Sequence, residues 1–140
     1  MNTKLILATL AGGILYFLLG WLIYGVLLMD FSMANTTQYA GLMKEMPDLL
    51  VLFLGNLSFA LLMAWIFQKW ANISSAGSGF SAGLFIGFLF AVTVDFMFYS
   101  MMNLYSITMV IVDIITTSVM SAIIGACIAW VLGFKSRTIS

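Results

Sequence analysis

The stretch "TVDFMFYSMMNLYSITMVIVDII", Thr93–Ile115, is almost entirely apolar, yet it carries two aspartates, Asp95 and Asp113. Each aspartate lies nine residues from Leu104. We expect a turn near Leu104 that joins two antiparallel membrane-spanning helices. At 1.5 Å per residue, such a hairpin places the two carboxyl groups level with each other, about 13 Å below its tip.

The composition of the whole chain supports this interpretation. Of 140 residues, 64% are hydrophobic and 7% are charged, whereas a soluble domain has roughly 25% charged residues. A helix needs about 20 apolar residues to cross the hydrocarbon core. The chain contains four such runs, at about residues 5–29, 49–68, 79–102 and 106–134. The sequence therefore predicts an all-α, polytopic membrane protein, with a four-transmembrane-helix bundle in up-down-up-down order and one transmembrane domain over residues 1–140.

Basic residues predict the orientation of this bundle, because lysine and arginine beside a span tend to stay in the cytoplasm. With four spans, Lys44 lies alone on one side of the membrane. The other four lie together on the opposite side: Lys4, Lys69, Lys135 and Arg137. We therefore expect both termini to be cytoplasmic.

The outer loop, residues 30–48, contains an amphipathic pattern. Four apolar side chains have the i, i+3, i+4, i+7 spacing of one helical face: Tyr39, Leu42, Met43 and Met46. This spacing predicts a short interfacial helix from about Thr36 to Met46. Pro47 is expected to end it, and Asp48 to cap the second span.

Small residues recur at every fourth position of the last two spans. The third span has Gly79, Gly83, Gly87 and Ala91, and the fourth has Ser121, Gly125 and Ala129. Small residues at this spacing let helix backbones approach closely within lipid. We expect these ridges to pack against each other or against the first span, with a homodimer seam as the alternative.

The two aspartates are the centre of a candidate intramembrane polar site. Four further polar side chains are expected at a similar depth: Asn56, Tyr24, Thr117 and Tyr99. One interpretation is structural, in which hydrogen bonds from these neighbours specify helix packing. The functional alternatives are a proton-sharing or cation site, or an anchor for a lipid headgroup or small ligand. At neutral pH, the two acids should not both be fully charged at the same time unless a cation or water lies between them.

Several chemistries lack the residues that they need. The chain has no histidine and one cysteine, Cys127, so ligands for haem, iron–sulfur clusters or a structural metal are missing. The glycines of "SSAGSGFSAG" have no P-loop lysine, and no base is available to activate a serine. We expect no enzymatic activity, cofactor or metal, and the absence of a basic cluster gives no reason to expect nucleic acid as a partner.

Two functional hypotheses from different classes follow. The first is a non-enzymatic membrane protein that binds membrane lipids or a partner membrane protein, with the loop at residues 30–48 as its contact surface. The second is a small proton- or cation-coupled transporter, or a channel-like homo-oligomer, that uses Asp95 and Asp113. Four helices are barely wide enough to enclose a transport path, so conduction would need an oligomer.

Two motifs resemble a family of small bacterial four-helix integral membrane proteins that has no assigned activity. The motif "LLGWLIYG", Leu18–Gly25, is similar to a Gly-x-x-x-Tyr signature, and "ITMVIVDIITTSVMSAIIGACIAW", Ile107–Trp130, is similar to that family's last span. The matching residues are Gly20, Tyr24, Asp113, Gly125 and Trp130. Asp95 lies outside the pattern. The resemblance implies a multi-pass protein of the bacterial cytoplasmic (inner) membrane.

The orientation can be tested with two single-cysteine variants, made after the native cysteine has been replaced. A membrane-impermeant maleimide added to intact cells should label Thr37→Cys, because we expect the first loop outside, and should not label Ser75→Cys. Labelling of both sites after permeabilisation is the control. Labelling of Ser75→Cys alone in intact cells would contradict the predicted topology.

Overall fold

The structure is a computed structural model and describes residues 2–134. Lys135 and Arg137, which contributed to the predicted orientation, lie outside the described residues. The elements, with η marking a π-helical turn, are α1 (Thr3–Leu22), η1 (Ile23–Leu27), α2 (Met29–Asn35), α3 (Leu49–Trp65), η2 (Ile66–Ala71), α4 (Ala76–Met101) and α5 (Ile107–Gly133).

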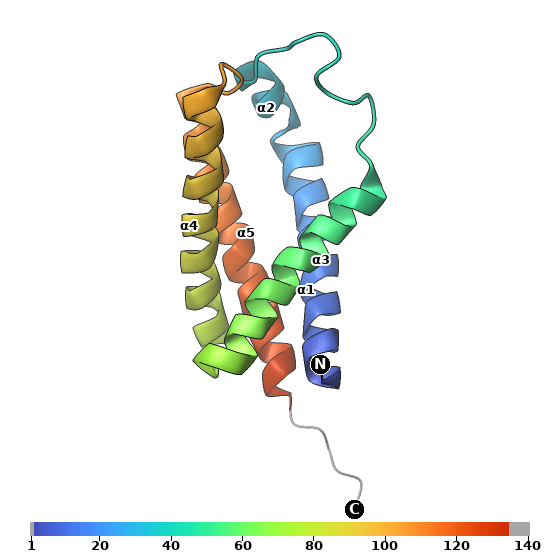
Figure 1. Cartoon of the computed structure of the whole chain (residues 1–140), viewed down its shortest axis with the longest axis vertical. Helices are drawn as coiled ribbons and strands as arrows, with labels where there is room; N and C mark the ends of the chain where they lie inside the picture. The colour runs from blue at the N-terminus through green and yellow to red at the C-terminus, as the bar shows by residue number, and fades with distance from the viewer. Residues whose placement is uncertain (1, 135–140) are drawn as a thin grey trace, which may run out of the picture.

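Four continuous helices are long and apolar enough to span a membrane: Thr3–Leu27, Leu49–Ala71, Ala76–Met101 and Ile107–Gly133. The predicted all-α bundle is therefore confirmed, and its length and composition indicate a multi-pass membrane protein. Figure 1 shows that α2 and the long connection to α3 lie at one end of the bundle, which we call the loop end, with the turn between α4 and α5. The opposite end carries the N-terminus and the end of α5.

Polar side chains define where the long helices begin. In each case a side-chain oxygen accepts a hydrogen bond from the backbone N–H three residues later, and so satisfies a donor that has no partner within the helix. The capping residues are Asn2, Asp48, Ser75 and Ser106. The predicted cap of α3 by Asp48 is confirmed.

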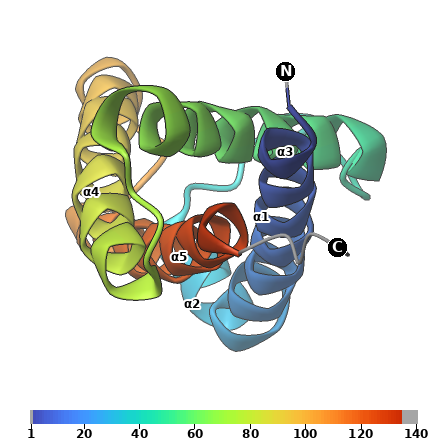
Figure 2. The same ribbon diagram turned by 90° about the horizontal axis from the view of Figure 1, so that it is seen from below.

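Helix α5 is the centre of the bundle. Figure 2 shows α4, α3 and α1 arranged around it, and α5 contains more buried residues than any other helix. Its Met120, Ile124 and Ile128 are almost fully buried, and they form one core cluster with Met63 and Phe67 from the α3 side. The contacts of α5 therefore position α4 and α1, whereas α3 packs mainly against α1.

The contact between α4 and α5 is a contact between backbones. A Cβ atom placed on Gly83 would collide with the carbonyl oxygen of Ser121, and one on Gly79 would collide with that of Gly125. On Gly87 it would collide with the Ser121 side chain. Only glycine permits this approach, so the small-residue ridges of the two helices lie against each other.

Helix α3 crosses the bundle at a steep angle. It runs from beside α4, at the end with the N-terminus, to the outer side of α1 at the loop end (Figures 1 and 2). Its second half is buried in the core around Ala60, Met63 and Ala64. Its first turn is not, since Leu50 and Val51 are 68% and 63% exposed. The first turn of α3 therefore lies outside the core of the bundle.

The predicted interfacial helix is corrected in position. A short helix does follow the first span, but it is α2, at Met29–Asn35, and residues 36–48 are not helical. The amphipathic spacing was misleading because this segment bonds to another part of the chain. The N–H of Thr37 donates to the carbonyl of Leu104, with N···O 2.7 Å, and the Tyr39 hydroxyl donates to that of Asn103.

The α4–α5 contact makes a stability prediction. Gly83→Ala should lower the free energy of unfolding by roughly 1–3 kcal/mol, because the helices must separate to admit the methyl group. Gly55→Ala is the matched control: no atom lies within 4 Å of its added Cβ, so higher helix propensity should leave it as stable as the parent or up to about 1 kcal/mol more stable. Unfolding in detergent micelles measures both. Equal stability of the two variants would contradict the backbone contact.

Candidate functional site

A polar network joins the first and last spans near the loop end. The hydroxyl of Tyr24 donates to Asp113 Oδ1, with an O···O distance of 2.6 Å. Thr117, one turn further along α5, donates to Asp113 Oδ2 at 3.4 Å and lies 3.4 Å from the Tyr24 hydroxyl. Asp113 therefore has a donor for each of its carboxyl oxygens.

The π-helical turn η1 carries Tyr24. A π-helical turn accommodates one extra residue, which changes the rotational position of the residues on either side by about 100° relative to an uninterrupted α-helix. Such turns often occur at functional sites. Here the turn lies where the chain leaves the regular geometry of α1 and brings a phenol against α5.

Both aspartates line a single cavity of about 360 Å³, which we call the acid cavity. Its walls come from η1, α2, the loop that follows α2, α4, α5 and the turn between them. They are formed by Tyr24, Ser32, Thr36, Met43, Val94, Asp95, Phe98, Tyr105, Met109, Val110 and Asp113. Asp95 lies six residues before the end of α4 and Asp113 six residues after the start of α5. The two are thus about 9 Å from their helix ends.

The acid cavity contains polar atoms that the protein does not satisfy. Within residues 2–134, Asp95 Oδ2 and Ser32 Oγ are buried and have no hydrogen-bond partner. A buried polar atom without a partner costs about 1–3 kcal/mol. A proton shared with Asp113, or a donor on an occupant of the cavity, would satisfy the Asp95 oxygen.

Tyr105 covers the acid cavity at the loop end. Its backbone pairs with that of Thr36, and the flanking bonds run from Thr37 N to Leu104 O (2.7 Å) and from Ser106 N to Asn35 O (2.9 Å). Burial, with a further contribution from the nearby Asp113 and Asp95 carboxylates, raises the pKa of the Tyr105 phenol. The Tyr105 phenol therefore remains protonated and uncharged at physiological pH.

Three aromatic rings pack together near the middle of the bundle. The Phe59 ring of α3 lies 5.5 Å from that of Tyr16 and 5.1 Å from that of Phe90, between ring centroids. Phe90 is five residues before Asp95 on α4, so the ring cluster lies below the carboxylates. No residue of α3 lines the acid cavity.

The structure does not bring every candidate residue to this cavity. Asp95, Asp113, Tyr24 and Thr117 meet at the acid cavity or in its hydrogen-bond network, whereas Asn56 is not among the lining residues. Tyr99 instead lines a neighbouring cavity. Sequence reasoning missed Ser32 and Tyr105, because neither has a spacing that relates it to the aspartates. The position of Tyr105 depends on its pairing with Thr36, which lies far away in the sequence.

The ligand set is unlike a dedicated metal site. Within the described part of the chain, no three His, Cys, Asp or Glu side chains come together, whereas Ca²⁺ takes six to eight oxygen ligands. The cavity lies in an all-α bundle whose four long apolar helices are those of a multi-pass membrane protein. Comparison with models of known protein families, with curated proteins and with solved structures finds no match.

The Tyr24–Asp113 bond can be measured by removing one hydroxyl. Tyr24→Phe should lower the free energy of unfolding by about 1–3 kcal/mol, because Asp113 loses its shortest donor in a partly buried site. Tyr39→Phe is the matched control, since its hydroxyl donates to a backbone carbonyl at the exposed surface; it should change stability by less than about 1 kcal/mol. Chemical unfolding in micelles compares the two variants. A Tyr24→Phe variant as stable as the parent would show that the bond to Asp113 contributes nothing.

Proposed function

We propose that this protein is a non-enzymatic integral membrane protein that binds the cationic head of a lipid or lipid-like amphiphile in the acid cavity. The observation that carries the proposal is the pair Asp95 and Asp113 in one cavity, with Asp95 Oδ2 buried and unpartnered. An ammonium group supplies both the charge and the N–H or polarised C–H groups that such an oxygen lacks.

The remaining walls suit an organic cation better than a bare ion. Phe98, Tyr24 and Tyr105 place aromatic rings around the acids, and aromatic faces attract ammonium groups through the ring quadrupole. Val94, Met109 and Val110 supply apolar surface that would contact the alkyl part of the ligand. A mainly apolar pocket with a few polar groups is typical of small-molecule sites.

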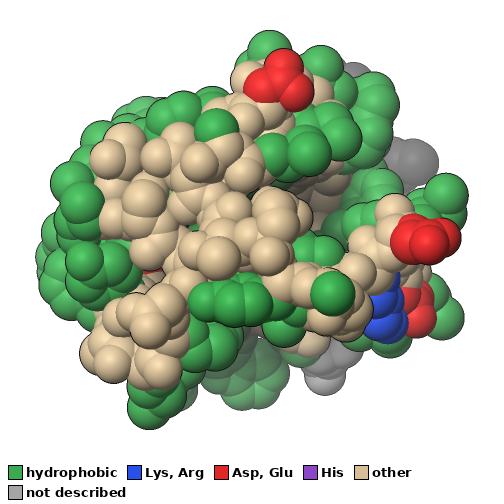
Figure 3. Space-filling view, turned by 90° about the horizontal axis from the view of Figure 1, so that it is seen from above, with side chains coloured by type: hydrophobic (Ala, Val, Ile, Leu, Met, Phe, Trp, Pro, Cys, Tyr) green, Lys and Arg blue, Asp and Glu red, His purple; other side chains and the backbone are tan. Residues whose placement is uncertain are grey.

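Access from the side of the bundle favours a membrane-borne ligand. No residue of α3 lines the acid cavity, and we propose that an amphiphile enters between η1 and α4 without leaving the bilayer. The loop end also attracts cations, since residues 30–48 contain three acidic residues and one basic one. Figure 3 shows this end with polar groups and backbone at its centre and acidic side chains towards its margin.

The basic residues and the resemblance to bacterial four-helix proteins support a specific location. We infer a multi-pass protein of the bacterial cytoplasmic membrane, with the loop end outside and both termini in the cytoplasm. The ligand would then come from the outer leaflet. A partner membrane protein or a second copy of the chain could use the exposed apolar faces, but neither is needed to form the cavity.

Proton or cation transport is the second candidate, and the shared cavity of Asp95 and Asp113 is the observation that favours it. Two neighbouring carboxyl groups can share or exchange a proton. Beyond the cavity, however, the Gly83 and Gly87 backbone lies against Ser121, which leaves little room along the α4–α5 contact.

Binding can be tested with octyltrimethylammonium and protein in nanodiscs of a lipid that has no amine in its headgroup, with heats corrected for empty nanodiscs. Asp95→Asn and Asp113→Asn should each weaken binding by about ten-fold or more, the equivalent of about 1.4 kcal/mol. Asp30→Asn makes the same charge change outside the cavity and should weaken binding far less than either cavity variant. Asp95→Asn and Asp30→Asn should unfold like the parent. Asp113→Asn should be less stable, because its amide nitrogen cannot accept one of the two bonds that the carboxylate accepts, so its unfolding is measured beside its binding.

Two outcomes would contradict this function. If octanol binds as tightly as octyltrimethylammonium, or if the cavity variants bind like the parent, the carboxyl pair does not recognise a cation. Proton or cation flux in proteoliposomes, abolished by Asp95→Asn, would establish the transporter instead.

A further inference from the structure

A second cavity lies beside the acid cavity at the loop end. It has a volume of about 600 Å³, and it shares Thr36 and Tyr105 with the acid cavity as a common wall. We call it the neutral cavity. Its lining residues are Ala34, Asn35, Thr36, Thr37, Tyr99, Met102, Asn103, Tyr105, Ser106 and Ile107.

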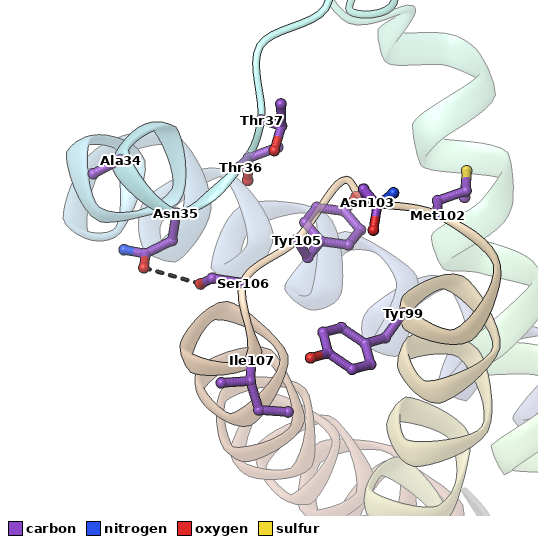
Figure 4. A pocket seen from close by; sticks show the side chains of 10 residues that line it. All are labelled: Ala34, Asn35, Thr36, Thr37, Tyr99, Met102, Asn103, Tyr105, Ser106 and Ile107. Carbon is purple, nitrogen blue, oxygen red and sulfur yellow. Dashed lines mark hydrogen bonds between the residues drawn. The ribbon is translucent and has the colours of Figure 1, made fainter.

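The lining of the neutral cavity is polar but carries no charge. Figure 4 shows Thr36 and Thr37 approaching from the side of α2, Tyr99 from α4, and Asn103 and Tyr105 from the turn. Within residues 2–134, the side chains of these five residues donate no hydrogen bond inside the protein. The bonds that these residues make involve only their backbone groups. They present four hydroxyl groups and one amide to an occupant.

This chemistry selects among headgroups. A phosphate would need lysine or arginine, and neither lines the cavity. A bare cation would need several oxygens with negative charge. Neutral hydroxyl and amide groups suit a ligand that itself carries several hydroxyls, because each partner then both donates and accepts. Tyrosine adds a rigid ring whose apolar body and polar tip contact such a ligand at low entropic cost.

The walls of the neutral cavity are held in place before any ligand binds. The Ser106 hydroxyl donates to Asn35 Oδ1, with O···O 3.0 Å, and the Asn35 amide donates to the Phe31 carbonyl at 3.0 Å. With the backbone pairing of Thr36 and Tyr105, these bonds connect α2 to the start of α5. Fixed walls lower the ordering cost of binding.

We propose that the neutral cavity binds an uncharged polyhydroxylated group, a sugar or polyol, carried by the headgroup of a membrane amphiphile. The proposal rests on the proposed function in one respect, namely that the acid cavity holds the cationic part of the same headgroup across Tyr105. The neutral cavity lies at the end of the bundle, where headgroups meet water, and the acid cavity lies deeper.

Three probes test this in the same nanodiscs: octyl glucoside, free glucose and octyltrimethylammonium. Octyl glucoside should bind the parent protein above the level of empty nanodiscs. Asn103→Ala and Tyr99→Ala should each weaken that binding by about ten-fold, since each removes hydrogen-bonding or stacking contact, and should leave octyltrimethylammonium binding unchanged. Asn56→Ala removes an amide outside both cavities and is the control.

The outcomes separate this inference from the proposed function. If octyltrimethylammonium binds but octyl glucoside does not, or if the two variants bind octyl glucoside like the parent, the sugar subsite is overturned and the cation site stands. If glucose binds as tightly as octyl glucoside, the membrane-borne source is overturned. Loss of octyl glucoside binding in Asn103→Ala and Tyr99→Ala, but not in Asn56→Ala, supports the subsite whatever the cation probe does.

Discussion

Helices inside a bilayer gain no hydrophobic free energy by exchanging lipid contacts for contacts with each other, so close packing must hold them together. In this protein the closest packing is between α4 and α5, where the Gly83 backbone touches that of Ser121. Such a contact fixes the register of the two helices. A shift of one residue would rotate a helix face by about 100° and carry Asp95 or Asp113 away from the shared cavity. The candidate site therefore depends on a glycine contact that lies outside it.

The course of α3 follows from the size of its side chains. Ala60 and Ala64 lie in the half of the helix that packs into the core, and Ala60 comes close to Gly12 of α1. Nearer the loop end, Phe59 contacts Phe90 of α4, Phe53 contacts Phe17 of α1, and Leu57 lies close to Gly13 of α1. Helix α3 is therefore held mainly against α1. None of its residues lines the acid cavity.

The sequence predicts well how far along a helix each residue lies, and poorly which way its side chain faces around that helix. Apolar run lengths predicted the four long helices, and the equal spacing of Asp95 and Asp113 from Leu104 placed them at one level. Asn56 was assigned by depth alone, and the tilt of α3 determines which way it faces. The helix expected at residues 36–46 failed because hydrogen bonds to the α4–α5 turn replaced helical ones. A single amphipathic repeat carries no information about hydrogen-bond partners that are distant in the sequence. The π-helical turn at Tyr24 likewise has no signal in the sequence.

The two aspartates differ in the hydrogen bonds that their carboxyl oxygens accept. This difference distinguishes between the structural and functional interpretations that the sequence left open. A purely structural role accounts for Asp113, because Tyr24 and Thr117 supply donors to both of its oxygens. Asp95 differs, because its Oδ2 is buried without a donor in the described chain. It therefore needs a proton or a donor on a bound ligand, since an unsatisfied buried oxygen reduces stability. We therefore interpret Asp113 as the positioned wall of the site and Asp95 as the group that receives the ligand or the proton.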